Sequence, residues 1–436
     1  MKPLFTVQHA HAAGVDIGAG SHYVCVGDDP DKDIRVFATF TVDLIALADW
    51  LQERGVTTVA MESTGVYWIP LFELLDRRGL HVILVDPRQT RRAGRPKTDR
   101  LDCQWIRRLH AAGLLSAAFR PADVICEFRA YLRLRLILVS DAGRHIQHMQ
   151  KALEQMNVKL HQVVDDTTGK TGLSIIRAIV RGEHRPAKLA QLRDPRCHHS
   201  EAEIAKALEG NWRPEHLFAL KQALQAWDFC KRQLKDCDDK LQHCLEQLPK
   251  KRPAADCVSK PYYAAGNAPR FDIRPLLAQV AGVDLTAIEG IDSTVAMILV
   301  GEVGINVDDF PTEKHFGSWT GLAPKAKASG KKRRDRTGPG ATRVAWALRL
   351  AAASLHRSQT ALGGFLRRLK GRLGAPKAIT ATAYKLARLV YRLLKHGHDY
   401  VARGVKEYEA AFRERTVRAL ERKAKAFGFA LVPMTT

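Results

Sequence analysis

Short predicted strands that alternate with helices fill the first 112 residues, and this alternation restricts the fold more than any other feature. Apolar, β-branched runs indicate strands at residues 15–17, 23–26, 34–40, 57–61 and 81–85. Helical spacing of apolar residues, stopped each time by a glycine, predicts helices at residues 44–54 and 67–78. This pattern is typical of an α/β domain with a mixed sheet covered by helices.

Four acidic residues lie at or near the ends of these elements. Asp16 is in a GVDIG strand, Glu62 directly follows the strand candidate at residues 57–61, and Asp99 and Asp102 share a KTDRLD segment. Sites in open α/β sheets form beside the carboxyl ends of strands, and residues three apart on a helix face the same way. Three segments can therefore bring carboxylates together. This arrangement suits two Mg²⁺ ions that act on a phosphodiester.

Other interpretations of these acids exist. A single Asp is often a turn or cap residue. A VDIG strand also opens actin-like and sugar-kinase folds, where the Asp-Gly turn approaches a nucleotide phosphate. Those folds have no use for a second carboxylate pair such as Asp99 and Asp102, which favours the metal site.

The charge of the chain favours a polyanionic partner. Its 436 residues include 69 Lys and Arg against 46 Asp and Glu, which gives a net charge of +23. Nucleic acid is expected before an anionic membrane. No apolar run approaches the roughly 20 residues of a membrane span, and no signal-peptide pattern opens the chain. The eight cysteines form no C-x-x-C pair, so we expect neither a zinc ribbon nor a disulfide framework but a cytoplasmic protein.

The middle of the chain is predicted to be helical. One long helix is expected at residues 126–164, and residues 220–248 contain a heptad seam of small and large apolar residues. The seam positions are Leu220, Ala223, Trp227, Cys230, Leu234, Cys237, Leu241, Cys244 and Leu248. Such a seam pairs either two copies or two helices of one chain. Residues 197–199 (CHH) lack a second ligand cluster, so no metal site is expected there.

The C-terminal part resembles a DNA clamp. An IEGID segment around Gly290, followed by an apolar helix, is similar to a helix-hairpin-helix, whose backbone N–H groups face a phosphate. Residues 325–334 are expected to form a loop in contact with nucleic acid, since six of its ten residues are cationic. These cations are Lys325, Lys327, Lys331, Lys332, Arg333 and Arg334. A basic amphipathic helix around residues 384–391 is expected to lie on nucleic acid or on the protein core.

The chain resembles a known family in two blocks. The segments GVDIGAGSHYVCV, VAMESTGVYW, LVDPRQTRRAGRPKTDRLDC and IRRLHAAGLL are similar to the N-terminal domain of the DEDD insertion-sequence transposases. These enzymes are the bridge-RNA-guided recombinases of bacterial mobile elements. The resemblance covers roughly residues 1–165, resumes near residue 285 and runs to near residue 415. It implies a RuvC-like, ribonuclease-H-type fold with Asp16, Glu62, Asp99 and Asp102 as catalytic Mg²⁺ ligands.

The same resemblance implies the remaining chemistry. The family places a catalytic serine just before a glycine in the basic loop, which falls on Ser329 and Gly330. It implies a covalent phosphoserine intermediate, a structured bridge RNA that pairs with donor and target DNA, and action at the bacterial nucleoid. The coiled coil through which the family assembles favours pairing of the heptad seam between copies, in a dimer or tetramer.

We therefore expect four regions. These are a RuvC-like catalytic domain at residues 1–165, a helical coiled-coil region at 166–250, a linker at 251–283, and a mostly α transposase domain at 284–436. Two alternatives stay open at this point. A RuvC-like junction nuclease would use the same acids and water, so Ser329 would be dispensable. A non-catalytic nucleic-acid-binding relative would need none of them.

Overall fold

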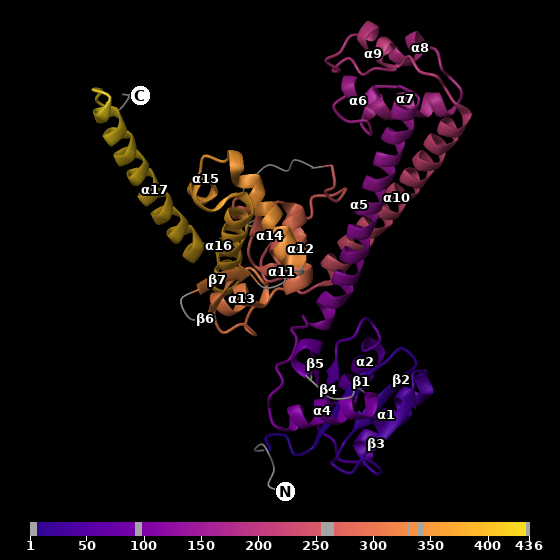
Figure 1. The fold of residues 1–436 in the computed structure, drawn as a ribbon, viewed down its shortest axis with the longest axis vertical. Helices are drawn as coiled ribbons and strands as arrows, with labels where there is room; N and C mark the ends of the chain where they lie inside the picture. Colours follow the sequence, from indigo (N-terminus) through magenta and orange to yellow (C-terminus); the bar gives the residue numbers. More distant parts are fainter. Residues whose placement is uncertain (1–6, 92–97, 254–265, 330–331, 338–342, 433–436) are drawn as a thin grey trace. The chain divides into compact units, whose positions relative to one another are not determined.

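The computed structural model describes residues 7–91, 98–253, 266–329, 332–337 and 343–432 (Figure 1). Contacts divide the chain into two compact units, Met1–Arg120 and Pro121–Thr436. Among the described residues, no helix has both the length and the apolar character needed to cross a membrane. The domain boundaries expected at residues 165, 250 and 283 stay a prediction.

The first unit is built on a five-stranded mixed sheet with the strand order β3-β2-β1-β4-β5. The strands are β1 (Ala12–Ile17), β2 (Ser21–Cys25), β3 (Ile34–Ala38), β4 (Thr58–Glu62) and β5 (His81–Val85). The helices are α1 (Thr41–Glu53), α2 (Ile69–Arg77), α3 (Pro87–Thr90) and α4 (Asp99–Ala111). Strands β1, β4 and β5 are parallel, whereas β2 and β3 run antiparallel to their neighbours. The predicted α/β class is confirmed, and the sheet is consistent with a RuvC-like fold.

Different helices cover the two faces of this sheet. Val15 of β1 and Met61 of β4 point into the core that α1 and α2 close. The alternate residues, among them Gly14 and Ala60, face α4 on the other side. At Gly14 the helix comes so close that an added Cβ would lie 2.2 Å from the backbone N of Arg107 and 2.5 Å from the carbonyl oxygen of Cys103. Only glycine permits this approach.

The second unit contains two long helices, α5 (Asp123–Gln155) and α10 (Pro214–Gln247), which pack antiparallel along their length (Figure 1). All nine positions of the predicted heptad seam are buried. Their partner is α5 of the same chain, so the expectation that the seam pairs two copies is corrected. The seam forms the alternative, a helical hairpin. Helix α5 also ends earlier than the predicted residue 164, because Asn157 takes a left-handed conformation with φ of 62°.

A small helical head caps one end of this hairpin (Figure 1). It consists of α6 (Leu160–Val163), α7 (Lys170–Val180), α8 (Pro186–Ala190) and α9 (Glu201–Ala207). The apolar side chains of the head and the hairpin end form one continuous core, for example Ile176 of α7 with Trp227 of α10. We call residues 157–210 the head.

The rest of the unit is mostly helical. The helices are α11 (Arg274–Ala281), η2 (Leu285–Ala287), α12 (Ser293–Val303), α13 (Glu313–Trp319), α14 (Arg343–Ser354), η3 (Leu355–Arg357), α15 (Ala361–Leu373), α16 (Ala375–His396) and α17 (His398–Ala426). Helix α12 is almost wholly buried and forms the centre of this part. Helix α11 lies within the expected linker, yet Leu277 and Val280 are buried, so residues 274–281 are structured. Part of that linker, residues 254–265, lies outside the described residues.

Helix α16 contains the predicted amphipathic segment and packs on the protein core. Leu386 and Val390 are buried, and the Tyr391 hydroxyl donates to the Phe310 carbonyl oxygen at 2.9 Å. Arg388 and Arg392 both donate to Glu313 of α13. The second of the two expected placements, on the core, is therefore the one found.

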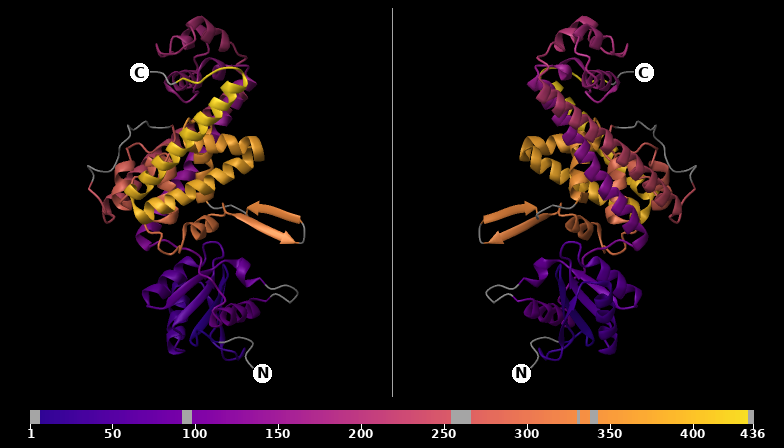
Figure 2. Two further views of the ribbon diagram at one scale, coloured as in Figure 1. Left: turned by 90° about the vertical axis from the view of Figure 1, so that its left-hand side faces the viewer. Right: turned by 90° about the vertical axis from the view of Figure 1, so that its right-hand side faces the viewer.

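The expected loop at residues 325–334 is instead a two-stranded ribbon. Strands β6 (Pro324–Ser329) and β7 (Lys332–Thr337) pair antiparallel, and the ribbon projects from the helices of this unit (Figure 2). The segment was expected to be irregular because it lacks the β-branched residues that usually mark a strand.

Candidate active site

Asp16 and Glu62 lie side by side at the carboxyl ends of two parallel strands. The β1–β4 pairing ends with Val15 opposite Met61, so one further step along both strands sets Asp16 beside Glu62. Neighbouring strands are about 4.8 Å apart. Both acids belong to the alternating set that faces α4. The expected meeting of these two residues at one sheet edge therefore agrees with the register.

Helix α4 runs over this face in the opposite direction to β4. His110, near its end, has Nε2 2.9 Å from Oγ1 of Thr58, the first residue of β4. One turn earlier the helix contacts Gly14. Its first turn therefore lies toward the carboxyl ends of the strands.

These contacts determine how far along the strands Asp99 and Asp102 lie. Asp16 lies two residues beyond Gly14, about 6.6 Å along the strand at about 3.3 Å per residue. A helix covers that distance in about four residues at about 1.5 Å each. Counting back from the Gly14 contacts at Cys103 and Arg107 gives residues 99–103. The first turn of α4, with Asp99 and Asp102, is therefore level with Asp16.

Two hydroxyl groups orient Glu62. Thr64 donates its Oγ1 hydrogen to Oε1 at 3.0 Å, and Thr90 of α3 donates to Oε2 at 2.9 Å. Asp16, Glu62 and Asp102 are half-buried and Asp99 is exposed. The two α4 acids also have an ordinary structural role, since carboxylates in the first turn of a helix are favoured by its dipole.

The four acids are chemically suited to Mg²⁺ without being gathered around one point. All are hard oxygen donors of the kind that Mg²⁺ takes. Among the residues that the structure describes, however, no three His, Cys, Asp or Glu side chains converge closely enough to hold a metal ion. A shared ion would have to draw the α4 carboxylates toward the strand ends. The donor set fits the ion, and their roles as ligands stay a prediction.

A pair of buried thiols lies beneath this site and was not anticipated from the sequence. Cys25 of β2 is the register partner of Gly14, and the Cys103 backbone lies over the same glycine. The hydrogen bond with Cys25, together with burial and the nearby Asp16 carboxylate, raises the pKa of the Cys103 thiol. Cys103 is therefore a neutral packing group. Its electrostatic contact with Asp16 is a second sign that Asp16 lies close to the first turns of α4.

Ser329 is the last residue of β6 in the basic ribbon. The register sets it opposite Lys332 and sets Lys327 opposite Arg334 and Lys325 opposite Arg336. The roles of Ser329 and of these cationic residues in binding nucleic acid stay a prediction. Arg333 is also in β7. Gly330 and Lys331, two residues of the predicted site, lie outside the described residues.

Two transposase family models match the chain. Residues 13–158 match the DEDD transposase of the IS110 type, and residues 284–365 match a transposase of the IS116/IS110/IS902 family. The chain belongs to the IS110-type insertion-sequence transposases. Transposases of this family cleave and rejoin DNA, so the chain is an enzyme and the non-catalytic alternative is set aside. No curated protein matches the chain significantly.

The two matches in this IS110-type transposase divide the candidate residues between them. The first contains all four acids and the second contains Ser329 and Gly290. The head lies almost entirely between the matched segments.

The backbone conformation and the packing at position 290 of the transposase both require glycine. Its φ is +85°, and an added Cβ would lie 2.7 Å from the Ala351 carbonyl oxygen at the end of α14. The preceding element is the short η2 rather than a full helix. The Asp292 side chain caps α12 by accepting from the Val295 N–H at 2.8 Å. Packing therefore accounts for the glycine, and phosphate binding there stays a prediction.

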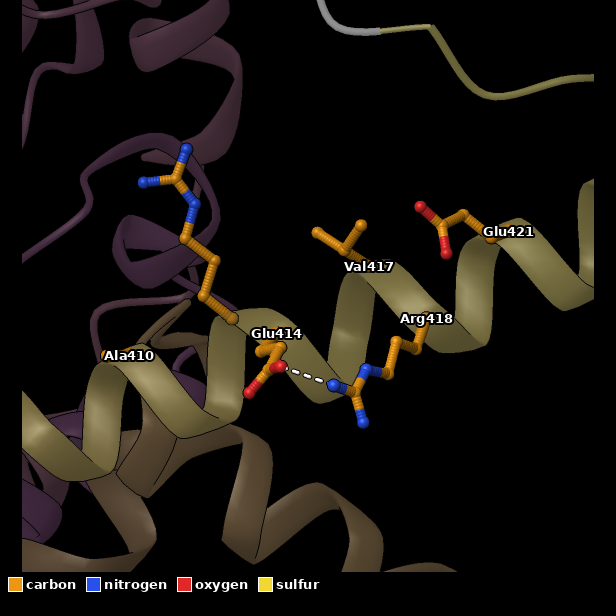
Figure 3. Close-up of a pocket in the computed structure, with 6 residues that line it drawn as sticks. Ala410, Glu414, Val417, Arg418 and Glu421 are labelled. Carbon is orange, nitrogen blue, oxygen red and sulfur yellow. Dashed lines mark hydrogen bonds and ion pairs between the residues drawn. The ribbon is translucent and has the colours of Figure 1, made fainter.

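A shallow surface hollow on α17 of the transposase does not add a second site. Figure 3 shows its lining, which comes from one helix and includes Ala410, Val417 and the ion pair between Glu414 and Arg418. Because no second element forms an opposite wall, we assign it no ligand.

Proposed function

We propose that this transposase is an RNA-guided DNA recombinase that cuts and rejoins donor and target DNA through a covalent phosphoserine. Asp16, Glu62, Asp99 and Asp102 would hold Mg²⁺, and Ser329 would be the nucleophile. The observation that supports this most is the placement of Asp16 and Glu62 on adjacent parallel strands, level with the first turn of α4.

The protein's own residues prepare the acid site. Thr64 and Thr90 hold the Glu62 carboxylate, and Gly14 lets α4 approach the sheet so that its acids lie near the strand ends. Bound Mg²⁺ would supply positive charge where negative charge develops on the scissile phosphate. The contact at Gly14 fixes the distance between α4 and the sheet. The rate of a reaction at such a site is sensitive to this distance.

Ser329 would carry the strand transfer. Its Oγ attacks the phosphorus, a Ser–phosphate bond forms, and the bond between phosphorus and the deoxyribose oxygen breaks. The hydroxyl proton leaves Ser329 and the departing oxygen takes up a proton. Attack by a DNA hydroxyl on the phosphoserine then reverses these steps and rejoins the strand, so no nucleotide cofactor is consumed. The cationic residues of the ribbon favour binding of the phosphate.

RNA guidance is supported by the charge of the chain. A net charge of +23 gives strong, unspecific binding to phosphate backbones. Sequence recognition can then be delegated to base pairing with a structured RNA, while the protein holds the duplexes by shape. We also propose a homo-oligomer. Since the heptad seam is filled by α5, the outer face of α5 with the exposed Leu134 and Ile137 is the surface for a second copy.

The decisive experiment follows labelled donor DNA on denaturing gels in the presence of Mg²⁺ and the co-purifying RNA. Wild type should give a covalent protein–DNA adduct, while Ser329→Ala and Asp16→Asn should bind nucleic acid and give none. Ser318→Ala, an exposed serine of α13, is the matched control and should behave as wild type.

The second candidate is a RuvC-like junction nuclease, which the same four carboxylates favour. Cleavage by Ser329→Ala at the wild-type rate would assign the attack to water and establish that function instead.

A further inference from the structure

We propose that the outer face of α14 around Trp346 is a stacking site for an unpaired nucleotide base. The inference rests on the proposed action on nucleic acid and adds a contact to it. Trp346 leaves 52% of its surface exposed, and Leu350, one turn later, is also exposed. The opposite face of the helix, with Val344 and Leu348, is buried in the protein. A helix at a protein surface normally turns polar residues outward, so an exposed Trp beside an exposed Leu indicates a contact surface.

The charged residues that neighbour Trp346 in the sequence are all positive. From Arg336 to Ser358 the sequence contains Arg336, Arg343, Arg349 and Arg357 and no Asp or Glu. Arg343 and Arg349 are each three residues from Trp346 and therefore share its side of the helix.

Arg343 carries charge that the protein compensates only weakly. Its Nε is 3.9 Å from Glu302, and half of its side chain is exposed. Glu302 is instead held by Arg133 of α5, with two hydrogen bonds of 2.8 and 2.6 Å. Arg343 therefore lies one turn before Trp346 on the helix, with half of its side chain exposed and able to approach an anion.

This combination selects a nucleic-acid strand as the occupant. A second copy docked on the same face would bring one positively charged face against an identical one, because such an interface uses the same surface on both copies. A phosphodiester strand matches both the exposed aromatic ring and the positive charges beside it. Its bases stack on an aromatic ring, and its phosphates pair with the flanking guanidinium groups. Strand exchange releases bases from pairing, and Trp346 would hold one in the same matched segment as Ser329.

Binding of short single strands tests the proposal. The full chain is titrated into labelled oligothymidine, oligouridine, and an abasic DNA strand of equal length and charge. Wild type should bind a base-bearing strand roughly tenfold more tightly than the abasic strand, as expected for one stacked base. Trp346→Ala should lose that preference, and Trp346→Phe should keep most of it. If Trp346→Ala weakens the binding of oligothymidine more than that of oligouridine, the site binds DNA. The reverse result indicates RNA.

Phe229→Ala is the matched control, since Phe229 is an exposed aromatic of α10 with the Arg232 guanidinium 6.0 Å from its ring centre. It should leave the base preference unchanged. An undiminished preference in Trp346→Ala overturns the proposal. A lower molar mass of free Trp346→Ala than of free wild type, measured by light scattering, would also overturn it, because the face would then bind a second copy. Wild type that binds duplex DNA without any base preference refutes this inference alone, whereas wild type that binds no nucleic acid refutes the proposed function as well.

Discussion

Arg135 of α5 and Asp238 of α10 form an ion pair inside the helical hairpin, with Arg135 Nε 2.6 Å from the carboxylate. The two side chains are only 3% and 2% exposed. Arg135 also donates to the Asn267 carbonyl oxygen at 3.0 Å, and Asp238 accepts from the Arg270 N–H at 3.1 Å. The pair therefore ties both long helices to the segment that leads into α11.

Removing one partner of this pair should destabilise the second unit strongly. Asp238→Asn leaves the Arg135 charge buried without its counterion, which typically costs about 3 kcal/mol or more. The neighbouring Asp239 is exposed, so Asp239→Asn should change the free energy of unfolding by less than about 0.5 kcal/mol. Urea denaturation of both variants measures the difference. Equal stability of the two would mean that the pair contributes little.

The heptad seam should control folding rather than assembly. Leu241 is fully buried against α5, and Leu241→Ala should lower the free energy of unfolding by about 3 kcal/mol. The exposed Phe229 of the same helix provides the comparison, and Phe229→Ala should cost below about 1 kcal/mol. Light scattering of folded Leu241→Ala should show the wild-type molar mass. A lower mass with unchanged stability would return the seam to an interface between copies.

Gly14 should be essential for DNA cleavage although it carries no side chain. Gly14→Ala forces α4 away from the sheet and moves Asp99 and Asp102 from the level of Asp16. A displacement of catalytic groups by about 1 Å can lower the reaction rate about 100-fold. Gly20 is the control, because an added Cβ there meets nothing within 4 Å. Cleavage assays at equal protein folding, checked by circular dichroism, should separate Gly14→Ala from Gly20→Ala. Similar rates for the two would show that the spacing of α4 is not critical.

The first unit should lose stability in mild acid through His110. Burial, together with the neighbouring His9 and His81, lowers the pKa of His110 from 6.5 to about 4. Between these values the unfolded chain binds the proton and the folded one does not, so stability rises with pH over this window. His110→Gln should flatten that rise, and the exposed His161→Gln should not. Thermal melting of the full chain from pH 4 to 7 gives the slopes, and an unchanged slope in His110→Gln would contradict the assignment.

Local patterns predicted the elements better than their partners. The strands around Asp16 and Glu62 follow from β-branched runs between glycines, and the parallel register then brings the two acids together. The spacing of Leu234 and Leu241 showed that one face of α10 is buried, but periodicity cannot tell which helix covers it. The contact of Gly14 with Cys103 joins residues far apart in the sequence, and no local signal marks it. The ribbon at Ser329 was missed because its Lys and Arg residues are typical of loops.

The head begins and ends at one place. The Asn211 N–H donates to the Met156 carbonyl oxygen at 3.0 Å, so the chain re-enters α10 beside the point where it left α5. Residues between these two points can be lengthened or replaced without changing the path of either helix, provided that the apolar hairpin end stays covered. Gene variants and engineered fusions that alter the size of this protein therefore have a natural point of insertion between Lys159 and Asn211, which lies between the two segments that match the transposase family.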